Sequence, residues 1–266
     1  MRRPYLATML VGGALALSVT ACGDDSSTAG STTTTALGAV PLGPDAVIDP
    51  GDGGRYRAEL DPADFVTGID NPYLPLVVGS RWVYEGESDG EAERIEVVVT
   101  DERRAIGGIV ATVVRDSVYV GGELVEDTYD WYAQDRDGNV WYLGEDSNDY
   151  EDGVNVSREG SWEHGVDGAQ AGIVMLAHPV EGGAYRQELL PGEAEDLGEV
   201  IRTGATVSTP VGDHDDVVVT EDWNPLEPDV VENKWYAPGV GMVREETVEG
   251  GRGSVELAAF TPGTRA

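Results

Sequence analysis

Cysteine is almost absent from this chain, since Cys22 is the only one among its 266 residues. A single cysteine excludes an internal disulfide and any metal site that needs several thiolates. Histidine is scarce as well. No two of the three present have a metal-ligand spacing such as HExxH; they are His164, His178 and His214. The sequence therefore predicts neither a cofactor nor a resident metal ion.

Lysine is equally rare, because Lys234 is the only one, and 17 basic residues stand against 50 acidic ones for a net charge of −33. So negative a surface repels phosphate backbones and anionic headgroups, and no polybasic patch offsets it. Nucleic acid is therefore excluded as a partner. We expect the acidic residues to form a solvated face rather than a specific store of cations.

The apolar stretch at residues 4–20 is shorter than the roughly 20 residues that a membrane-spanning helix needs. It follows Arg2 and Arg3 and ends in small residues, which is the order of a secretory signal. The residues before Cys22 are Val19, Thr20 and Ala21.

This ending resembles the bacterial lipobox, in which cleavage before the cysteine makes it the mature N-terminus. A thioether then joins its sulfur to diacylglycerol, whose acyl chains are of the palmitate type. The resemblance implies a signal peptide at residues 1–21 and lipid attachment at Cys22. The protein would be held by this lipid on the outer face of the cytoplasmic membrane, after export by either the general or the twin-arginine route.

Two further regions follow the signal. Residues 22–50 are rich in Ser, Thr, Gly, Ala and Pro and show no apolar periodicity, so we expect a lipidated cysteine followed by a disordered tether. Residues 51–266 are of a length suited to a single β domain.

The folded region reads as one strand after another, with turn residues between them. The strands are expected at residues 81–85, 94–100, 109–120, 124–134, 139–143, 172–176, 184–190, 201–209, 216–223, 232–237, 242–248 and 254–260. Only residues 193–201 have apolar residues at helical spacing, and Gly198 weakens that pattern. Without helices to make parallel crossovers, we predict an all-β fold: a curved antiparallel meander, half-barrel-like, with at most one or two short helices.

Aromatic residues gather in one predicted hairpin, with Trp131 and Tyr132 before the turn and Trp141 and Tyr142 after it. A two-residue loop at 137–138 would pair residue 134 with 141 and residue 132 with 143. Both faces then carry aromatics, so at least one face is core. We favour core packing for them, with a ligand groove on the other face as the alternative.

The turn itself carries oxygen ligands at alternate positions, Asp135, Asp137 and Asn139, as calcium loops do. It lacks the glutamate that closes a twelve-residue calcium loop. The same residues suit a tight turn, because Asp and Asn bond their own backbone and Gly138 tolerates a positive φ. We favour the plain turn and keep a calcium-binding surface protein as an alternative.

Catalytic patterns are weak. Ser161 lies in the sequence EGSWE, which is not a GxSxG nucleophile elbow, and the chain has no phosphate-binding loop. A Ser-His-Asp triad can be scattered along a chain, so an envelope hydrolase stays an alternative. The sequence as a whole favours a protein that is not an enzyme.

Four phrases together resemble a family of exported bacterial lipoproteins with no assigned activity. They are residues 65–86 (FVTGIDNPYLPLVVGSRWVYEG), 129–146 (YDWYAQDRDGNVWYLGED), 160–175 (GSWEHGVDGAQAGIVM) and 236–243 (YAPGVGMV). A long antiparallel meander behind a lipobox is also similar in architecture to the LolA/LppX-type half-barrel lipoproteins. We therefore expect a binding or scaffold module, with an apolar small molecule or another envelope component as its ligand.

Overall fold

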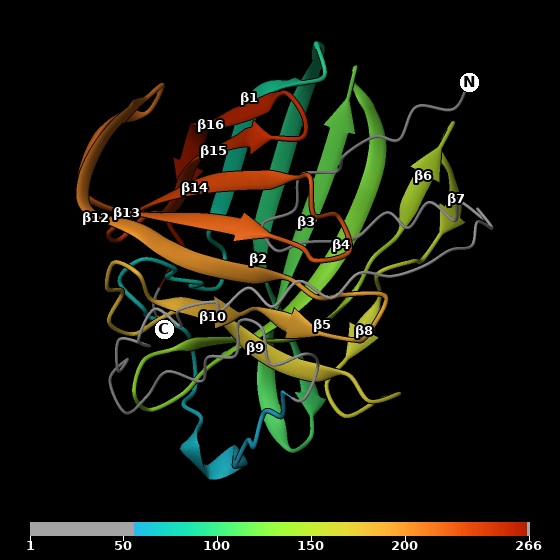
Figure 1. The fold of residues 1–266 in the computed structure, drawn as a ribbon, viewed down its shortest axis with the longest axis vertical. Coiled ribbons are helices and arrows are strands. Elements are labelled where there is room, and N and C mark those ends of the chain that lie inside the picture. The colour runs from blue at the N-terminus through green and yellow to red at the C-terminus, as the bar shows by residue number, and fades with distance from the viewer. Residues whose placement is uncertain (1–55, 265–266) are drawn as a thin grey trace, which may run out of the picture.

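The computed structural model describes residues 56–264, and these form one large antiparallel β sheet (Figure 1). The predicted signal peptide, the lipobox at Val19, Thr20 and Ala21, the lipidated Cys22 and the tether at 22–50 lie outside the described residues. The strands are β1 (Arg81–Ser88), β2 (Glu91–Ile106), β3 (Ile109–Val120), β4 (Glu123–Gln134), β5 (Val140–Asp146), β6 (Asp149–Glu151), β7 (Val154–Ser157), β8 (Trp162–Glu163), β9 (Gln170–Met175), β10 (Ala184–Arg186), β11 (Glu188–Leu189), β12 (Leu197–Thr209), β13 (Gly212–Trp223), β14 (Val231–Ala237), β15 (Gly241–Glu249) and β16 (Gly253–Thr261).

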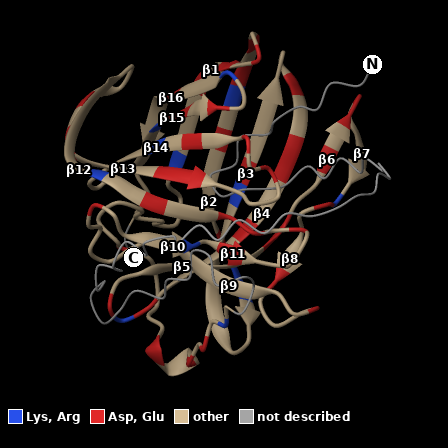
Figure 2. Cartoon of the chain, viewed as in Figure 1, with Lys and Arg blue, Asp and Glu red and all other residues tan. Residues whose placement is uncertain are grey.

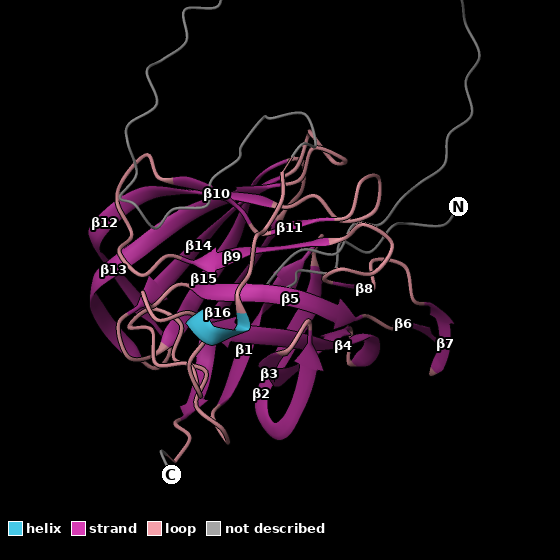
Figure 3. Cartoon of the chain, turned by 90° about the horizontal axis from the view of Figure 1, so that it is seen from below, coloured by secondary structure: helices cyan, strands magenta, loops and turns pink. Residues whose placement is uncertain are grey.

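The sheet curls until its two ends nearly meet. Its strand order is β10-β12-β13-β14-β15-β16-β1-β2-β3-β4-β5-β9-β11, and every pair is antiparallel. The end strands β10 and β11 are separated in sequence only by Gln187, so one chain segment bonds to both ends (Figure 3). This confirms the predicted all-β antiparallel fold, in a form more closed than a half-barrel.

Tight glycine turns explain why consecutive strands pair as hairpins. Between β3 and β4, Gly121 and Gly122 have φ values of +60° and +89°. A two-residue hairpin turn of this kind needs positive φ at both positions, which glycine adopts without a steric cost. This turn falls between the strands expected at residues 109–120 and 124–134, which β3 and β4 confirm.

The predicted helical spacing at residues 193–201 is wrong as a helix signal. Leu197–Thr209 forms strand β12, whose first residues pair with Trp223 and its neighbours on β13. Cross-strand hydrogen bonds outweigh the weak local preference at this position. The one helical element among the described residues is a three-residue 3-10 turn, η1 (Pro62–Asp64). No helix among these residues is long and apolar enough to span a bilayer.

The register of the aromatic hairpin differs by one residue from the prediction. Tyr132 pairs with Tyr142 and Ala133 with Trp141. The cause is a wider turn, because the backbone N–H of Asp135 donates to the carbonyl of Asn139 and so extends the loop beyond two residues. A one-residue slip exchanges the faces, so Trp141 does not share a face with Tyr132 as expected.

Candidate functional site

One end of the barrel is covered by the loop at residues 65–80, and Asn71 fixes this loop in place. Its Oδ1 accepts from the backbone N–H groups of Tyr73 and Leu74 at 2.8 and 3.2 Å. Its Nδ2 donates to the carbonyls of Gly138 and Leu176 at 2.9 and 3.2 Å. A single buried amide thus joins the loop to the β4–β5 turn and to the end of β9.

Gln134, at the end of β4, binds the same loop through hydrogen bonds of its side-chain amide. Its Oε1 accepts from the backbone N–H groups of Asp70 and Asn71, both at 2.8 Å, and its Nε2 donates to Asp70 Oδ1 at 2.8 Å. On the other side, the Gly239 N–H donates to the Pro72 carbonyl at 2.7 Å. Three of the four recognised phrases therefore meet at this end of the barrel.

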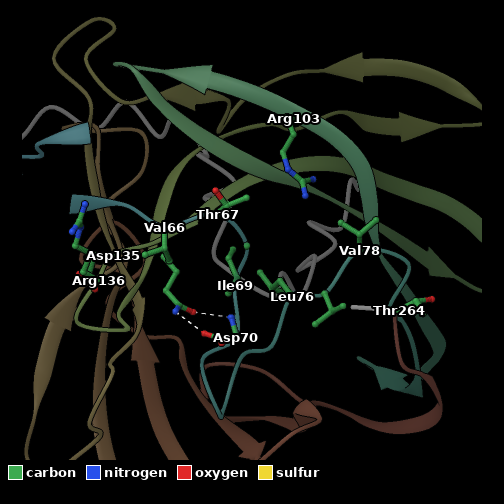
Figure 4. Close-up of a pocket in the computed structure, with 13 residues that line it drawn as sticks. Val66, Thr67, Ile69, Asp70, Leu76, Val78, Arg103, Asp135, Arg136 and Thr264 are labelled. Atoms are coloured by element: carbon green, nitrogen blue, oxygen red, sulfur yellow. Dashed lines mark hydrogen bonds between the residues drawn. The ribbon is translucent and has the colours of Figure 1, made fainter. Parts of the chain in front are cut away.

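A cavity of about 570 Å³ lies between this loop, β2 and the β4–β5 turn (Figure 4). Ligand pockets are commonly of this size. Its lining combines an aliphatic part with polar and charged residues, and Ile69 and Leu76 of the aliphatic part continue into the main hydrophobic core. The lining residues are Val66, Thr67, Gly68, Ile69, Asp70, Leu76, Val77, Val78, Arg103, Gln134, Asp135, Arg136 and Thr264.

Arg103 lies on the same face of β2 as the buried Val97 and Val99. The pairing of β2 with β3 shifts between Val99 and Arg103, but Val99 lies opposite Val114 and Arg103 opposite Thr112, so both stay on one face of the sheet. Figure 4 shows the Arg103 side chain reaching over the cavity from the strand.

The Asp135 turn uses its oxygens internally. Asp135 Oδ1 accepts from the Gly138 and Asn139 N–H groups, and Oδ2 accepts from Asn139 Nδ2 and Trp141 Nε1, at 2.8 to 2.9 Å. The Asn139 Oδ1 accepts from the Ala177 N–H at 2.8 Å. The described residues contain no group of three His, Cys, Asp or Glu side chains that could hold a metal ion. This geometry favours the turn interpretation over the calcium alternative.

Inside the barrel, many acidic side chains are buried, which the predicted solvated face did not anticipate. On β4, the inward positions alternate as Glu126, Thr128, Asp130 and Tyr132, and all four are buried. Figure 2 shows acidic residues within the strands as well as in the loops. The buried or largely enclosed carboxyl groups with raised pKa values are Glu93, Glu126, Asp130, Glu145, Glu188, Asp196, Glu232 and Glu245.

Loss of solvation is the main cause of these shifts. Burial raises the pKa of Glu126 to about 8, and it raises the pKa values of Asp130 and Asp196 to about 7. Burial, followed by the neighbouring Glu188 carboxyl, raises the pKa of Glu145 well above its usual range. A carboxyl group with a pKa of about 8, such as that of Glu126, is mostly protonated at pH 7, so the interior carries less negative charge than its number of carboxyl groups suggests.

Lys234 is the one lysine of the chain, and it lies inside this acidic cluster with 2% of its side chain exposed. Its Nζ is 3.2 Å from Asp222 Oδ2, 3.9 Å from Glu245 Oε2 and 4.0 Å from Glu232 Oε2. Burial alone would lower the pKa of Lys234, but the three carboxyl groups outweigh burial and raise it. Lys234 therefore stays charged and neutralises part of the cluster.

The predicted aromatic residues are core rather than a ligand surface. Trp131, Tyr132, Trp141 and Tyr142 are all buried, and none of them lines the cavity. Tyr132 and Tyr142 stack at 5.0 Å between ring centroids, and the Tyr142 hydroxyl donates to Asp130 at 2.7 Å. The favoured core interpretation thus describes them, while the alternative of a ligand groove at these residues does not.

The histidines expected of a hydrolase are on separate elements. His164 follows β8 and accepts from the Ala171 N–H at 3.0 Å, His178 follows β9, and His214 lies on β13 within 3.1 Å of the Thr209 hydroxyl. Ser161 bonds to the backbone of Ser147. None of these side chains lines the cavity, so the described geometry does not assemble the scattered triad.

Sequence reasoning missed the cavity residues, Arg103 above all. The alternation of β2 places Arg103 in phase with the buried Val97 and Val99, but a strand pattern alone does not show that a cavity lies beside that position. One signal was available: the recognised phrases around Asn71, Gln134 and Gly239 converge on the same barrel end. Their proximity in space could have been suggested, although not the aliphatic lining of the cavity.

Comparisons with known proteins complete the description. No family model matches this chain, and no curated protein matches it. A crystal structure of a candidate lipoprotein from Parabacteroides distasonis ATCC 8503 is similar over 72% of this chain and 99% of that chain, with 14% sequence identity and a TM-score of 0.34. A TM-score this low does not support a functional inference, so the function is inferred from the residues of the site itself.

Proposed function

We propose that this protein is a lipid-anchored binding module of the bacterial cell envelope, and that the cavity at the barrel end holds the apolar part of a small envelope molecule. The anchoring rests on the lipobox-like residues Val19, Thr20 and Ala21 before the single Cys22. The binding role rests on one observation above others, which is a cavity of about 570 Å³ whose lining has an aliphatic part.

The cavity suits an apolar group because its floor is part of the core. Ile69 and Leu76 are buried residues of the main hydrophobic cluster, and Val66 and Val78 extend the same lining toward solvent. Covering this surface with an alkyl chain removes apolar area from water, which contributes about 25 cal/mol per Å². The hydrogen bonds of Asn71 and Gln134 keep the cavity preformed, so little ordering cost is added on binding.

Replacing Val78 by Trp should block the cavity and weaken the binding of an uncharged alkyl probe at least tenfold. Val78 lines the cavity and is only partly buried, so the larger side chain can occupy the cavity without displacing the core. Isothermal titration of octan-1-ol into full-length protein in lipid nanodiscs measures the effect. Val110→Trp is the matched control, because Val110 is 61% exposed and does not line the cavity. Equal octanol binding by both variants would refute the cavity as the site.

Replacing Cys22 by Ala should abolish lipid attachment, change precursor processing and release the protein from the membrane into the medium. The reason is that two acyl chains on one sulfur supply the anchoring energy, at about 0.8 kcal/mol for each buried CH₂. Fractionation with immunoblotting, with and without globomycin, measures both processing and release. Normal size and membrane retention under both treatments would show that the protein is not anchored through Cys22.

A further inference from the structure

The charged side chains around the cavity differ in how many hydrogen bonds they already make within the protein. Asp135 accepts four hydrogen bonds within its turn. Arg136 donates its Nε to the Ala63 carbonyl at 2.9 Å, on the side of η1. Asp70 is engaged by the Gln134 side chain through both its backbone N–H and its Oδ1. The two carboxylates are therefore held by several contacts, whereas Arg136 is turned toward η1 by a single hydrogen bond.

Arg103 and Arg136 are alike in making one side-chain hydrogen bond to a backbone carbonyl, but only Arg103 reaches over the aliphatic part of the lining. The side-chain bond of Arg103 runs from Nη1 to the carbonyl of the adjacent Glu102 at 2.9 Å, and within residues 56–264 neither arginine has a carboxylate partner. A guanidinium has five N–H donors, so most donors of Arg103 stay available. The position of Arg103 over the cavity, rather than the absence of an ion pair, distinguishes it.

A second hollow contains an arginine whose guanidinium is paired with carboxylates. This hollow of about 590 Å³ lies on β1, β2 and β3 and contains Arg94, which binds the carboxylates of Glu85 and Glu96. Those two acids satisfy the cation, so that hollow offers no unpaired arginine to an anion. Arg103, by contrast, keeps donors that an anion in its cavity could use.

We propose that the ligand of the cavity is an anionic amphiphile, with its alkyl chain against Val66, Ile69 and Leu76 and its carboxylate or phosphate on the Arg103 guanidinium. This inference rests on the proposed function, since it assigns a head group to the molecule whose apolar part fills the cavity. Figure 4 shows the required arrangement, in which Arg103 lies above the aliphatic lining. A planar guanidinium binds carboxylate and phosphate through paired hydrogen bonds, which adds orientation as well as charge.

The test compares probes that share one alkyl chain and differ in charge: octanoate, octyl phosphate, octan-1-ol and octylammonium. Each is titrated calorimetrically into full-length protein in nanodiscs, with Val78→Trp protein as the background for partitioning into lipid. The wild type should bind at least one of the two anions about tenfold more tightly than octanol, as one charge-assisted contact provides. Arg103→Gln should remove this preference and weaken octanol binding much less than anion binding. Arg202→Gln should change nothing, because Arg202 is an exposed arginine that does not line the cavity.

The outcomes separate the two proposals. A preference for octanoate, for octyl phosphate or for both supports the inference and shows which head group the site accepts. Equal binding of octanol and the anions, or an anion preference that survives Arg103→Gln, overturns the inference while the apolar cavity stands. Preference for octylammonium overturns it in favour of Asp70. If no probe binds above the Val78→Trp background, the proposed function fails together with the inference.

Discussion

Raising the pH from 5 to 8 should lower the melting temperature of this protein by on the order of 10 °C. Paired carboxylates with lowered pKa values have the opposite effect, because they stabilise a protein as the pH rises. Burial raises the pKa of Glu93 to about 7 and that of Glu126 to about 8, well above the unfolded values near 4. The native state therefore binds more protons than the unfolded chain between about pH 4 and pH 8. Stability is then fully present below about pH 4 and is lost as the pH rises through 7 to 8.

The size of the effect follows from the same shifts. One pKa unit corresponds to about 1.4 kcal/mol, and about 1 kcal/mol moves the melting temperature by roughly 2–4 °C in a domain of this size. Glu126→Gln should raise the melting temperature at pH 8 and leave it nearly unchanged at pH 5, since the amide replaces a carboxyl that is protonated there. Scanning calorimetry across this pH range is the measurement.

A control on the same strand separates buried carboxyls from surface repulsion. Glu123 begins β4 and is exposed, so Glu123→Gln should alter the melting temperature little at either pH. Repulsion between surface charges is screened by 1 M salt, whereas the cost of buried groups is screened much less. A pH dependence that disappears in high salt, or that Glu123→Gln reduces as much as Glu126→Gln does, would contradict the buried cluster as its source.

Replacing Lys234 by Met should destabilise the protein by about 3–5 kcal/mol at pH 8, the largest loss expected of any charged residue described. The change leaves Asp222, Glu232 and Glu245 buried without their cation. Removing one partner of a buried ion pair leaves the other charge buried without a counter-charge, which is why the loss of stability is large. At pH 5 the loss should be smaller, because carboxyls with raised pKa values then take up protons instead.

Chemical denaturation at the two pH values measures this difference. Arg81→Met is the matched control, since Arg81 makes an exposed ion pair with Glu96 and its removal should cost about 1 kcal/mol or less. The double change Lys234→Met with Asp222→Asn should recover part of the loss at pH 8. Equal losses at pH 5 and pH 8 would show that Lys234 acts through packing rather than charge.

The fold could be predicted from the sequence because its signals are local. Turns such as Gly121-Gly122 and strands of alternating pattern determine an antiparallel meander. The hairpin register could not be predicted, because it depends on the four hydrogen bonds that Asp135 makes within the turn. One residue of extra loop length is enough to move Trp141 to the other face.

The acidic interior could not be predicted for a different reason. Alternation on β4 places either face of the strand inward with equal ease, and the apolar face is the usual choice for a core. Glu126 and Asp130 instead point inward, where other buried polar groups and retained protons offset the cost. The single Lys234, in a sequence rich in acidic residues, suggests an ion pair. Its position among three buried carboxyl groups could be seen only in the folded sheet.

Native mass spectrometry of the full-length protein purified from its own host tests the binding account most directly. The wild type and the Val110→Trp variant should carry a bound small molecule that the Val78→Trp variant lacks. Fragmentation of that molecule should show an alkyl chain with a carboxylate or phosphate, and Arg103→Gln should reduce its occupancy. A wild-type protein that is empty when taken from its host, or the same molecule bound equally to the Val78→Trp variant, would contradict the account.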